Sequence, residues 1–500
     1  MSDSFLAATS TRAADGLDLT GLSLSSSSAA DAALIPFYTY CRVRSEYFQG
    51  SGNGMACTQD VASGEILLSV PLDYCWTAAA ARANPALAAL GDGPLDAISP
   101  ENLIALHLLI IKASPEPPAT AAAADRCRWH HVKLIASTPI ETLWDWSDAE
   151  LKQNFQGSKW ALAPSWSKAD TLADLEEWSQ YPPLLELFKA YEIHKLSYLW
   201  AHKVLNSRMT SFKRAKDGSI LQLIAPGQDL FNHSADAPVS NEDVQIDDDK
   251  SLVVVRANRS YKQGEQATFH YSGTSNGRLL FSGGFVLATN PWDSVELALT
   301  LPLHQSAGPL FAELASTLDS GVKHGGAFAE ALPAEFIEMA QTEDGSDPTD
   351  FVVHMRLMLS TLPEQLMRVL RFYIAAEHYS SYSTQITMAE IDMLAGTKAV
   401  AIQKLRNGLL SMSSGYPVVR AANEAELRTM EGEAAAGKFH PPAAEHDDDF
   451  DRNDPKWERA HRRRRHALLV VIGEQRIWEA GLAMLDRELS LLMTAGAGAA

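Results

Sequence analysis

The order in which strand-like and helical patterns alternate along the chain limits its fold more than any other feature. Short apolar runs typical of β-strands occupy about 37–80 and return at 218–287. Helical patterns fill 85–210 and the chain after about 305. The simplest explanation of this unusual order is an α+β protein, in which one β-rich domain carries a helical insertion and is followed by a separate all-α domain.

The strand pattern is clearest in three segments. GEILLSVP at 64–71 is an apolar run closed by a proline, and SLVVVRA at 251–257 is rich in valine. Farther along, apolar and polar side chains alternate, so Ala267, Phe269 and Tyr271 share one face of a predicted strand. The first segment precedes the predicted insertion and the others follow it, so together they predict one interrupted β-rich domain.

Start signals and apolar faces mark the predicted helices. Ser99-Pro100 is a typical helix beginning, and Ser147 to Glu150 is a capping box. Two faces at helical spacing are Tyr198, Ala201, Leu205 and Arg208, and Trp478, Leu482, Leu485, Leu489 and Leu492. The first face belongs to the predicted insertion and the second to the C-terminal domain.

The composition excludes several classes of protein. Acidic residues outnumber Lys and Arg by 62 to 42, so the net charge of −20 argues against nucleic acid as a partner and favours basic protein segments. No apolar run approaches the roughly 18 residues of a membrane-spanning helix, so we expect no membrane contact. Neither the four cysteines, which lack CxxC spacing, nor the histidines form a metal-binding pattern, so we expect no metal.

Single candidates for chemistry are weak on their own. Cys57 and Cys75 are candidate nucleophiles, although a buried apolar role is the commoner one for cysteine. His130 and His131 are adjacent and therefore point in different directions. Gly52-Asn53-Gly54 is half of a dinucleotide-binding fingerprint, and a tight hairpin turn in SGNG is the favoured interpretation.

Two low-complexity segments are predicted to lie outside the folded domains. Residues 1–36 are rich in Ser and Ala and predict a disordered leader. Their aspartates, against the single Arg12, argue against a transit peptide, so we expect a cytoplasmic or nuclear protein with a plastid as the alternative. Segment 430–465 joins an acidic run to Arg462–Arg465 and predicts a flexible, solvated excursion, with a nuclear address as the alternative for the arginines.

Six motifs follow one another in an order that points to a family. They are GNGMACTQDVASGEILLSVP from Gly52, LWDWSDAELKQNFQGS (143–158), WAHKVLNSR (200–208), DLFNHS (229–234), YSGTSN from Tyr271 and GGFV from Gly283. Over roughly 45–500 the chain resembles the SET-domain methyltransferases typified by the plant Rubisco large-subunit lysine methyltransferase. That class also includes the actin histidine methyltransferase.

The resemblance implies an architecture and a cofactor. The β-rich SET core is expected at 37–85 and 205–295, with its helical insertion at 86–204. A helical substrate-binding domain is expected at 300–500. The implied cofactor is S-adenosylmethionine, and the implied partner is a protein whose lysine or histidine side chain is methylated. We expect the enzyme to be a monomer.

The resemblance also assigns roles to individual residues. The implied cofactor-binding residues are Gly52, Asn53, Gly54, Arg208, Asp229, Asn232, His233, Tyr271 and Phe285. Tyr271 matches the catalytic tyrosine, whose hydroxyl lies near the transferring methyl group. Arg208 either meets the carboxylate of the methyl donor or forms a structural ion pair with Asp229.

Three positions in the implied substrate pocket depart from the lysine-methylating pattern. Thr210 and Gln228 match neither the lysine-methylating nor the histidine-methylating members, and Gly283 stands where a second tyrosine is usual. The expected activity is methylation of lysine on a non-histone protein. Methylation of histidine and a non-catalytic scaffold that keeps the SET fold are the alternatives.

Overall fold

The structure is a computed structural model that describes most of the chain between residues 34 and 497. The described residues are 34–48, 52–138, 140–214, 217–238, 243–271, 273–302, 337–339, 350–360, 362, 367, 370, 371, 374, 396–435 and 455–497. The predicted leader lies outside them except for residues 34–36, and so does 436–454 of the predicted excursion.

The chain divides into two compact units, each built from three segments. The first unit is Met1–Trp146, Ala163–Gly273 and Leu280–Gly284, and the second is Ser147–Leu162, Thr274–Leu279 and Phe285–Ala500. The predicted insertion, 86–204, therefore contributes to both units rather than to one. Residues 147–162 belong to the second unit, where Ser158 and Glu150 bond to the helix α19 (Pro455–Ala497): Ser158 Oγ donates to Glu474 at 3.0 Å, and Arg463 Nη1 donates to Glu150 at 2.5 Å.

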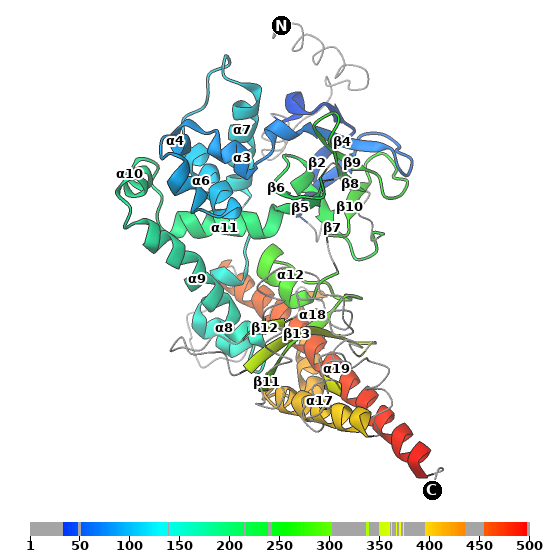
Figure 1. Cartoon of the computed structure of the whole chain (residues 1–500). Helices are drawn as coiled ribbons and strands as arrows, with labels where there is room; N and C mark the ends of the chain where they lie inside the picture. Colours follow the sequence, from blue (N-terminus) through cyan, green and yellow to red (C-terminus); the bar gives the residue numbers. More distant parts are fainter. Residues whose placement is uncertain are drawn as a thin grey trace, which may run out of the picture. The chain divides into compact units, whose positions relative to one another are not determined.

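Three small sheets form the β-rich part of the first unit. The first sheet has the strand order β1 (Tyr40–Cys41), β4 (Ile66–Pro71), β9 (Leu252–Arg256), β8 (Val244–Asp247). The second has the order β2 (Val43–Phe48), β3 (Gly52–Cys57), β10 (Gln266–Phe269), β7 (Asn232–His233). The third pairs β5 (Thr210–Lys213) with β6 (Ile220–Leu223). Strands from both sides of the insertion thus pair directly, which confirms the predicted interruption of one β-rich domain (Figure 1).

The strand β10 buries two of the three residues that alternation put on one face, whereas Tyr271 lies beyond its end and is 48% exposed. Ala267 is fully buried and Phe269 is nearly so, and both pack with Val43, Met55 and Phe231 in one apolar cluster. Burial of such side chains stabilises a fold by about 1.5–3 kcal/mol for each large residue. Since the cluster draws on strands before and after the insertion, it holds the two halves of the β-rich part together.

Helices make up most of the remaining described residues of the first unit. They are α3 (Ala78–Arg82), α4 (Pro85–Ala88), α5 (Asp92–Asp96), α6 (Pro100–Ala113), α7 (Ala123–Ser137), α9 (Ala163–Trp178), α10 (Pro182–Ala190) and α11 (Lys195–Arg208), with the 3-10 turns η1 (Ile35–Phe37), η2 (Leu72–Tyr74), η3 (Leu143–Asp145) and η5 (Gln228–Leu230). As predicted, Ser99 caps α6 by accepting from Asn102 N.

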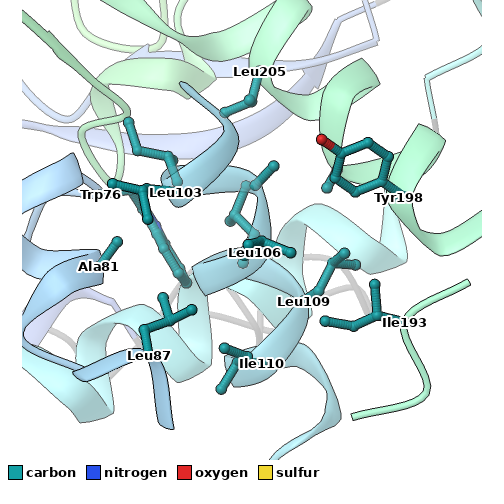
Figure 2. Packing of buried hydrophobic residues seen from close by; sticks show 14 of the residues in the cluster. Trp76, Ala81, Leu87, Leu103, Leu106, Leu109, Ile110, Ile193, Tyr198 and Leu205 are labelled. Carbon is teal, nitrogen blue, oxygen red and sulfur yellow. The ribbon is translucent and has the colours of Figure 1, made fainter. Parts of the chain in front are cut away.

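The helix α6 lies at the centre of the helical core. It is buried from Asn102 to Ile110, and its leucines meet Trp76, Tyr198 and Leu205 (Figure 2). The Tyr198 hydroxyl donates to Asn102 Oδ1 at 3.0 Å, which satisfies both buried polar groups. Trp76 follows the β-strand β4 in sequence, so this core is anchored to the β-rich part.

The second unit is not all-α, and this corrects the prediction for the C-terminal domain. It contains an antiparallel sheet with the order β11 (Ser294–Pro302), β13 (Asp350–Met358), β12 (Ile337–Met339). The sequence SVELALTLP of β11 alternates with period two, and Val295 and Leu297 are buried as that period requires. The predicted boundary of the SET core at 295 falls inside this strand. The alternation of β11 was therefore divided between two predicted domains and was not recognised as a strand.

Helices complete the second unit. Among the described residues they are α8 (Asp148–Asn154), α17 (Thr397–Ser413), α18 (Arg420–Ala435) and α19 (Pro455–Ala497), with the turn η4 (Lys159–Ala161), while α12 (Asn276–Gly283) is divided between the units. Ser147 and Glu150 form the predicted capping box of α8. Trp478 and Leu485 of the predicted stripe on α19 are buried in the core of this unit, as the spacing predicted.

Candidate functional site

One sheet of the first unit brings together three motifs that lie far apart in the sequence. Strand β10 pairs antiparallel with β3, which carries Gly52 to Gly54, and parallel with β7, which consists of Asn232 and His233. Tyr271 follows β10 by two residues. Asn232 Nδ2 donates to Asn53 O at 3.0 Å, so the two motifs that flank β10 are also joined directly.

The interpretation of Gly52 to Gly54 as a hairpin turn is wrong. These residues form the start of β3 and pair with Phe48, Tyr47 and Glu46 of β2. Gly54 instead makes room for two side chains: a Cβ there would lie 2.4 Å from Gln266 Nε2 and 2.6 Å from Asn232 Nδ2. Two polar side chains therefore cross the backbone of β3 at the point where the strand has no side chain.

Arg208 forms an ion pair with Asp229, which is one of the two alternatives predicted for its partner. The guanidinium Nη1 donates to Asp229 Oδ2 at 2.8 Å and to Asp229 O at 3.0 Å, and both side chains are nearly or completely buried. Burial raises the pKa of Asp229, but its contacts with His131 and Arg208 outweigh burial and bring the pKa to about 2. Asp229 is therefore a carboxylate at neutral pH.

Tyr271 and His233 lie against each other at the end of this sheet. Their ring centroids are 5.2 Å apart, and the Tyr271 N–H donates to His233 Nδ1 at 3.1 Å. Burial, helped by the neighbouring His270, lowers the pKa of His233 to about 4, so its ring is neutral at pH 7. Although Tyr271 is 48% exposed overall, its hydroxyl turns inward and donates to Phe231 O. Burial raises the pKa of this hydroxyl to about 12.

Three buried polar atoms in this region have no hydrogen-bond partner within the described part of the chain. They are Arg208 Nε, Gln228 Oε1 and Gln266 Nε2. Unpaired buried polar atoms cost about 1–3 kcal/mol each and are uncommon in folded proteins. Arg208 Nε and Gln228 Oε1 belong to the ion pair and its neighbouring residue, and Gln266 Nε2 lies beside Gly54. Gln266 alternates with Ala267 along the strand, but nothing local in the sequence indicates a role for it.

The predicted pocket residues lie in different elements of the first unit. Thr210 begins β5 opposite Leu223 of β6, and Gln228 immediately precedes Asp229 in η5. Gly283 ends α12 and precedes Gly284, which has a positive φ of 75° and where a Cβ would lie 2.1 Å from the Glu141 carbonyl oxygen. Phe285, the remaining predicted cofactor-binding residue, belongs to the second unit, so its proximity to this sheet stays a prediction.

The cysteines have the predicted apolar role. All four thiols are free, and burial raises the pKa of Cys57 to about 11 and that of Cys127 to about 12. Burial also raises the pKa of Cys75, so these thiols are not activated nucleophiles. Among the described residues, no group of three or more His, Cys, Asp or Glu could hold a metal ion. No helix in the described ranges is long and apolar enough to cross a membrane.

The whole chain aligns with solved structures of one fold. A structure described as the SET domain of LSMT bound to lysine and AdoHcy covers 94% of this chain and 93% of its own, with a TM-score of 0.65 and 17% identity. The chain has the SET fold of LSMT. Rubisco LSMT bound to AdoMet aligns over the same shares, with a TM-score of 0.61 and 16% identity. At the level of fold, the predicted resemblance to the Rubisco methyltransferase class is therefore confirmed.

Sequence comparison adds one curated relative. The actin-histidine N-methyltransferase of Danio rerio is 24% identical over 266 residues, which are 50% of this chain. The match spans only 40% of that relative's length. No family model matches the chain.

Proposed function

We propose that the chain is an S-adenosylmethionine-dependent protein N-methyltransferase. The observation that carries the proposal is the convergence of Gly54, Asn232 and Tyr271 at one sheet of a SET fold. Asp229, which lies a few residues before Asn232 in the sequence, forms an ion pair with Arg208 in the same unit. Solved proteins with this fold are described as bound to AdoMet, AdoHcy, lysine and methyllysine.

The residues around this sheet fit such a methyl donor. The donor carries a carboxylate, a positively charged sulfonium, a ribose and an adenine. Arg208 retains a buried Nε–H without a partner in the described ranges, which suits an anionic group. Gly54 leaves the backbone of β3 open to close approach, and Asn232 is already held across that strand. Gln266 Nε2 offers a further buried donor beside them.

The chemistry divides between the donor and the protein. When bound, S-adenosylmethionine would supply a methyl group on a sulfonium: an uncharged nitrogen would attack the methyl carbon in line, so that the C–N bond forms as the C–S bond breaks and the neutral thioether S-adenosylhomocysteine leaves. Because the pKa of Tyr271 is about 12, its hydroxyl stays protonated at neutral pH and orients the acceptor nitrogen instead of acting as a strong base. A lysine has a reference pKa near 10.4, so the site must favour its neutral form, which burial and a nearby positive charge both do.

We propose lysine on a non-histone protein as the acceptor. The support is the alignment with structures described as bound to lysine or methyllysine. Histidine is the second candidate, because the curated relative is an actin-histidine N-methyltransferase and because Gly283 provides no tyrosine hydroxyl in the pocket. The net charge of −20 favours a basic target segment. A monomer in the cytoplasm or nucleus completes the proposal.

Calorimetric titration with S-adenosylmethionine tests the proposal first. One-site binding to the wild-type chain that Asn232→Ala weakens is the expected result, because the substitution removes the contact with Asn53 O. Arrays of paired peptides with Lys or His at the target position then separate the two acceptors. Absence of donor binding in a folded sample would refute the enzyme and favour a scaffold that has kept the SET fold.

A further inference from the structure

His131 is a completely buried residue of α7 in which both ring nitrogens have partners. Trp76 Nε1 lies 2.8 Å from His131 Nδ1, and His131 Nε2 lies 3.0 Å from Asp229 Oδ1. An indole N–H can only donate, so Nδ1 must be the acceptor. This assignment puts the ring proton on Nε2, which donates to Asp229, and the imidazole is neutral.

The His131 hydrogen bond is one of a set that fixes the Asp229 carboxylate. Oδ1 accepts from His131 and, at 3.1 Å, from the backbone N–H of Gly227. Oδ2 accepts from Arg208 Nη1, which also bonds to the backbone oxygen of Asp229. With each oxygen held from a different side, the carboxyl group has one orientation, and so does the guanidinium that it binds.

Further hydrogen bonds hold the backbone around the partners of His131. Trp76 N donates to Ile224 O at 2.9 Å and Ile224 N donates to Trp76 O at 3.1 Å, just before the segment that carries Asp229. On α7, Arg128 Nε donates to Cys75 O at 3.3 Å, and Arg128 also bonds to Asp73 O. The helical insertion and the segment that carries Asp229 are therefore fixed to each other close to His131.

We infer that His131 is a positioning residue of the methyl-donor site: it orients Asp229 and, through Asp229, aims the free Nε–H of Arg208 at the donor. The inference rests on the proposed function, and it assigns a role in binding to a residue of the insertion, 98 positions before Asp229. His131 touches no reacting group. Its effect passes through one hydrogen bond to Asp229 and one ion pair to Arg208.

His107 provides a matched control in the same core. It is 2% exposed, and its ring centroid lies 5.2 Å from that of Trp76, the residue that also bonds to His131. Its Nδ1 has no partner in the described part of the chain, and no bond joins it to Asp229. Replacing His107 disturbs packing around Trp76 without touching the carboxylate. If affinity for the methyl donor fell only because the core was damaged, variants of both histidines would therefore show the loss.

The test compares affinity for S-adenosylmethionine, measured by calorimetry on the full chain, among His131→Phe, His131→Gln and His107→Phe. We expect His131→Phe to weaken binding by roughly tenfold or more, the effect of losing a hydrogen bond to a charged group. Gln offers an acceptor and a donor on one amide, so His131→Gln should recover most of the affinity. His107→Phe should stay within about threefold of the wild type. Equal losses in both Phe variants, or wild-type affinity in His131→Phe, would overturn the inference.

A second readout needs no ligand. Nitrogen-15 spectra of the histidine rings should show His131 with its proton on Nε2 and none on Nδ1, as the contacts with Asp229 and Trp76 require. The opposite tautomer, with the proton on Nδ1, would overturn the positioning role. If the spectra show the fixed tautomer but the wild-type chain binds no S-adenosylmethionine, the proposed function fails and the donor-site role fails with it. If the wild type binds and the His131 variants bind equally well, only the positioning role fails.

Discussion

Two buried carboxyl groups in the second unit should make the stability of this unit fall as pH rises. Glu474 of α19 is 4% exposed; its Oε1 accepts from Ser158 Oγ at 3.0 Å and its Oε2 from the Tyr416 hydroxyl at 2.8 Å. Burial raises the pKa of Glu474 to about 7 despite these bonds, and the charge of Asp293 acts in the same direction. Burial also raises the pKa of Asp293 to about 6.

The sign and size follow from proton linkage. The folded chain keeps the Glu474 proton until about pH 7, whereas an unfolded glutamate loses it near 4.5. The stabilising contribution of the protonated group is therefore fully present below about pH 4.5 and is lost as pH rises to about 7. At ~1.36 kcal/mol per pH unit, this difference corresponds to ~3 kcal/mol. Glu474→Gln cannot ionise and can keep both polar contacts, so at pH 8 the variant should be more stable by up to ~3 kcal/mol.

The measurement must be local, because a chain of two units need not unfold in one step. Hydrogen exchange of the α19 peptide that contains Glu474, corrected for intrinsic rates, gives the opening free energy at several pH values. Protection in the wild type should fall between about pH 5 and pH 7.5, and Glu474→Gln should reduce this slope. Glu479→Gln is the control on the same helix: its carboxylate is 55% exposed and pairs with Arg420, so it should leave the slope unchanged.

One result would refute the reasoning. If Glu474→Gln and the wild type lost protection with the same slope, Glu474 would not be the group that keeps its proton on folding. If the fall of protection with pH disappeared in an Asp293→Asn variant instead, the proton would belong to Asp293, which lies beside Glu474 in the same buried site.

The remaining predictions concern the candidate site. Tyr271→Phe removes the hydroxyl but keeps the ring against His233, so S-adenosylmethionine binding should persist while turnover falls by at least about a hundredfold in single-turnover assays; unchanged turnover would remove Tyr271 from the mechanism. Gly54→Ala places a Cβ 2.4 Å from Gln266 Nε2 and 2.6 Å from Asn232 Nδ2, and calorimetry should show donor binding weakened by more than tenfold. Normal affinity in Gly54→Ala would mean that these side chains can move aside without consequence.

Features that repeat locally could be predicted from the sequence. The period of two in β10 correctly buried Ala267 and Phe269, and the spacing of four and three on α19 correctly buried Trp478 and Leu485. These predictions succeed because periodicity reports which face of an element is apolar, whatever the element packs against. The order of the six motifs likewise predicted the fold before any pairing of strands was known.

Features that depend on contacts across the chain could not be predicted in this way. The sequence shows His131 next to His130, but nothing local shows that its partners are Trp76 and Asp229, 55 and 98 residues away. Gly52 to Gly54 was misread for the same reason. Glycine suits a turn because its backbone can adopt unusual angles, and it also suits a place where other side chains pass close to the backbone, because it has no side chain. Only the positions of Asn232 and Gln266 distinguish these two explanations.

The stability of the first unit and its proposed activity are linked through the unpaired atoms of the site. Arg208 Nε, Gln228 Oε1 and Gln266 Nε2 are buried without partners in the described ranges, at a cost of about 1–3 kcal/mol each. A chain selected only for stability would replace or pair them, as it has paired the ring nitrogens of His131. The unpaired atoms lie beside Asp229, whose two carboxylate oxygens both accept hydrogen bonds, and beside Gly54, whose backbone carries no side chain. A ligand that supplies the missing partners gains that free energy on binding, so the site is better suited to a polar donor molecule than to a purely structural role.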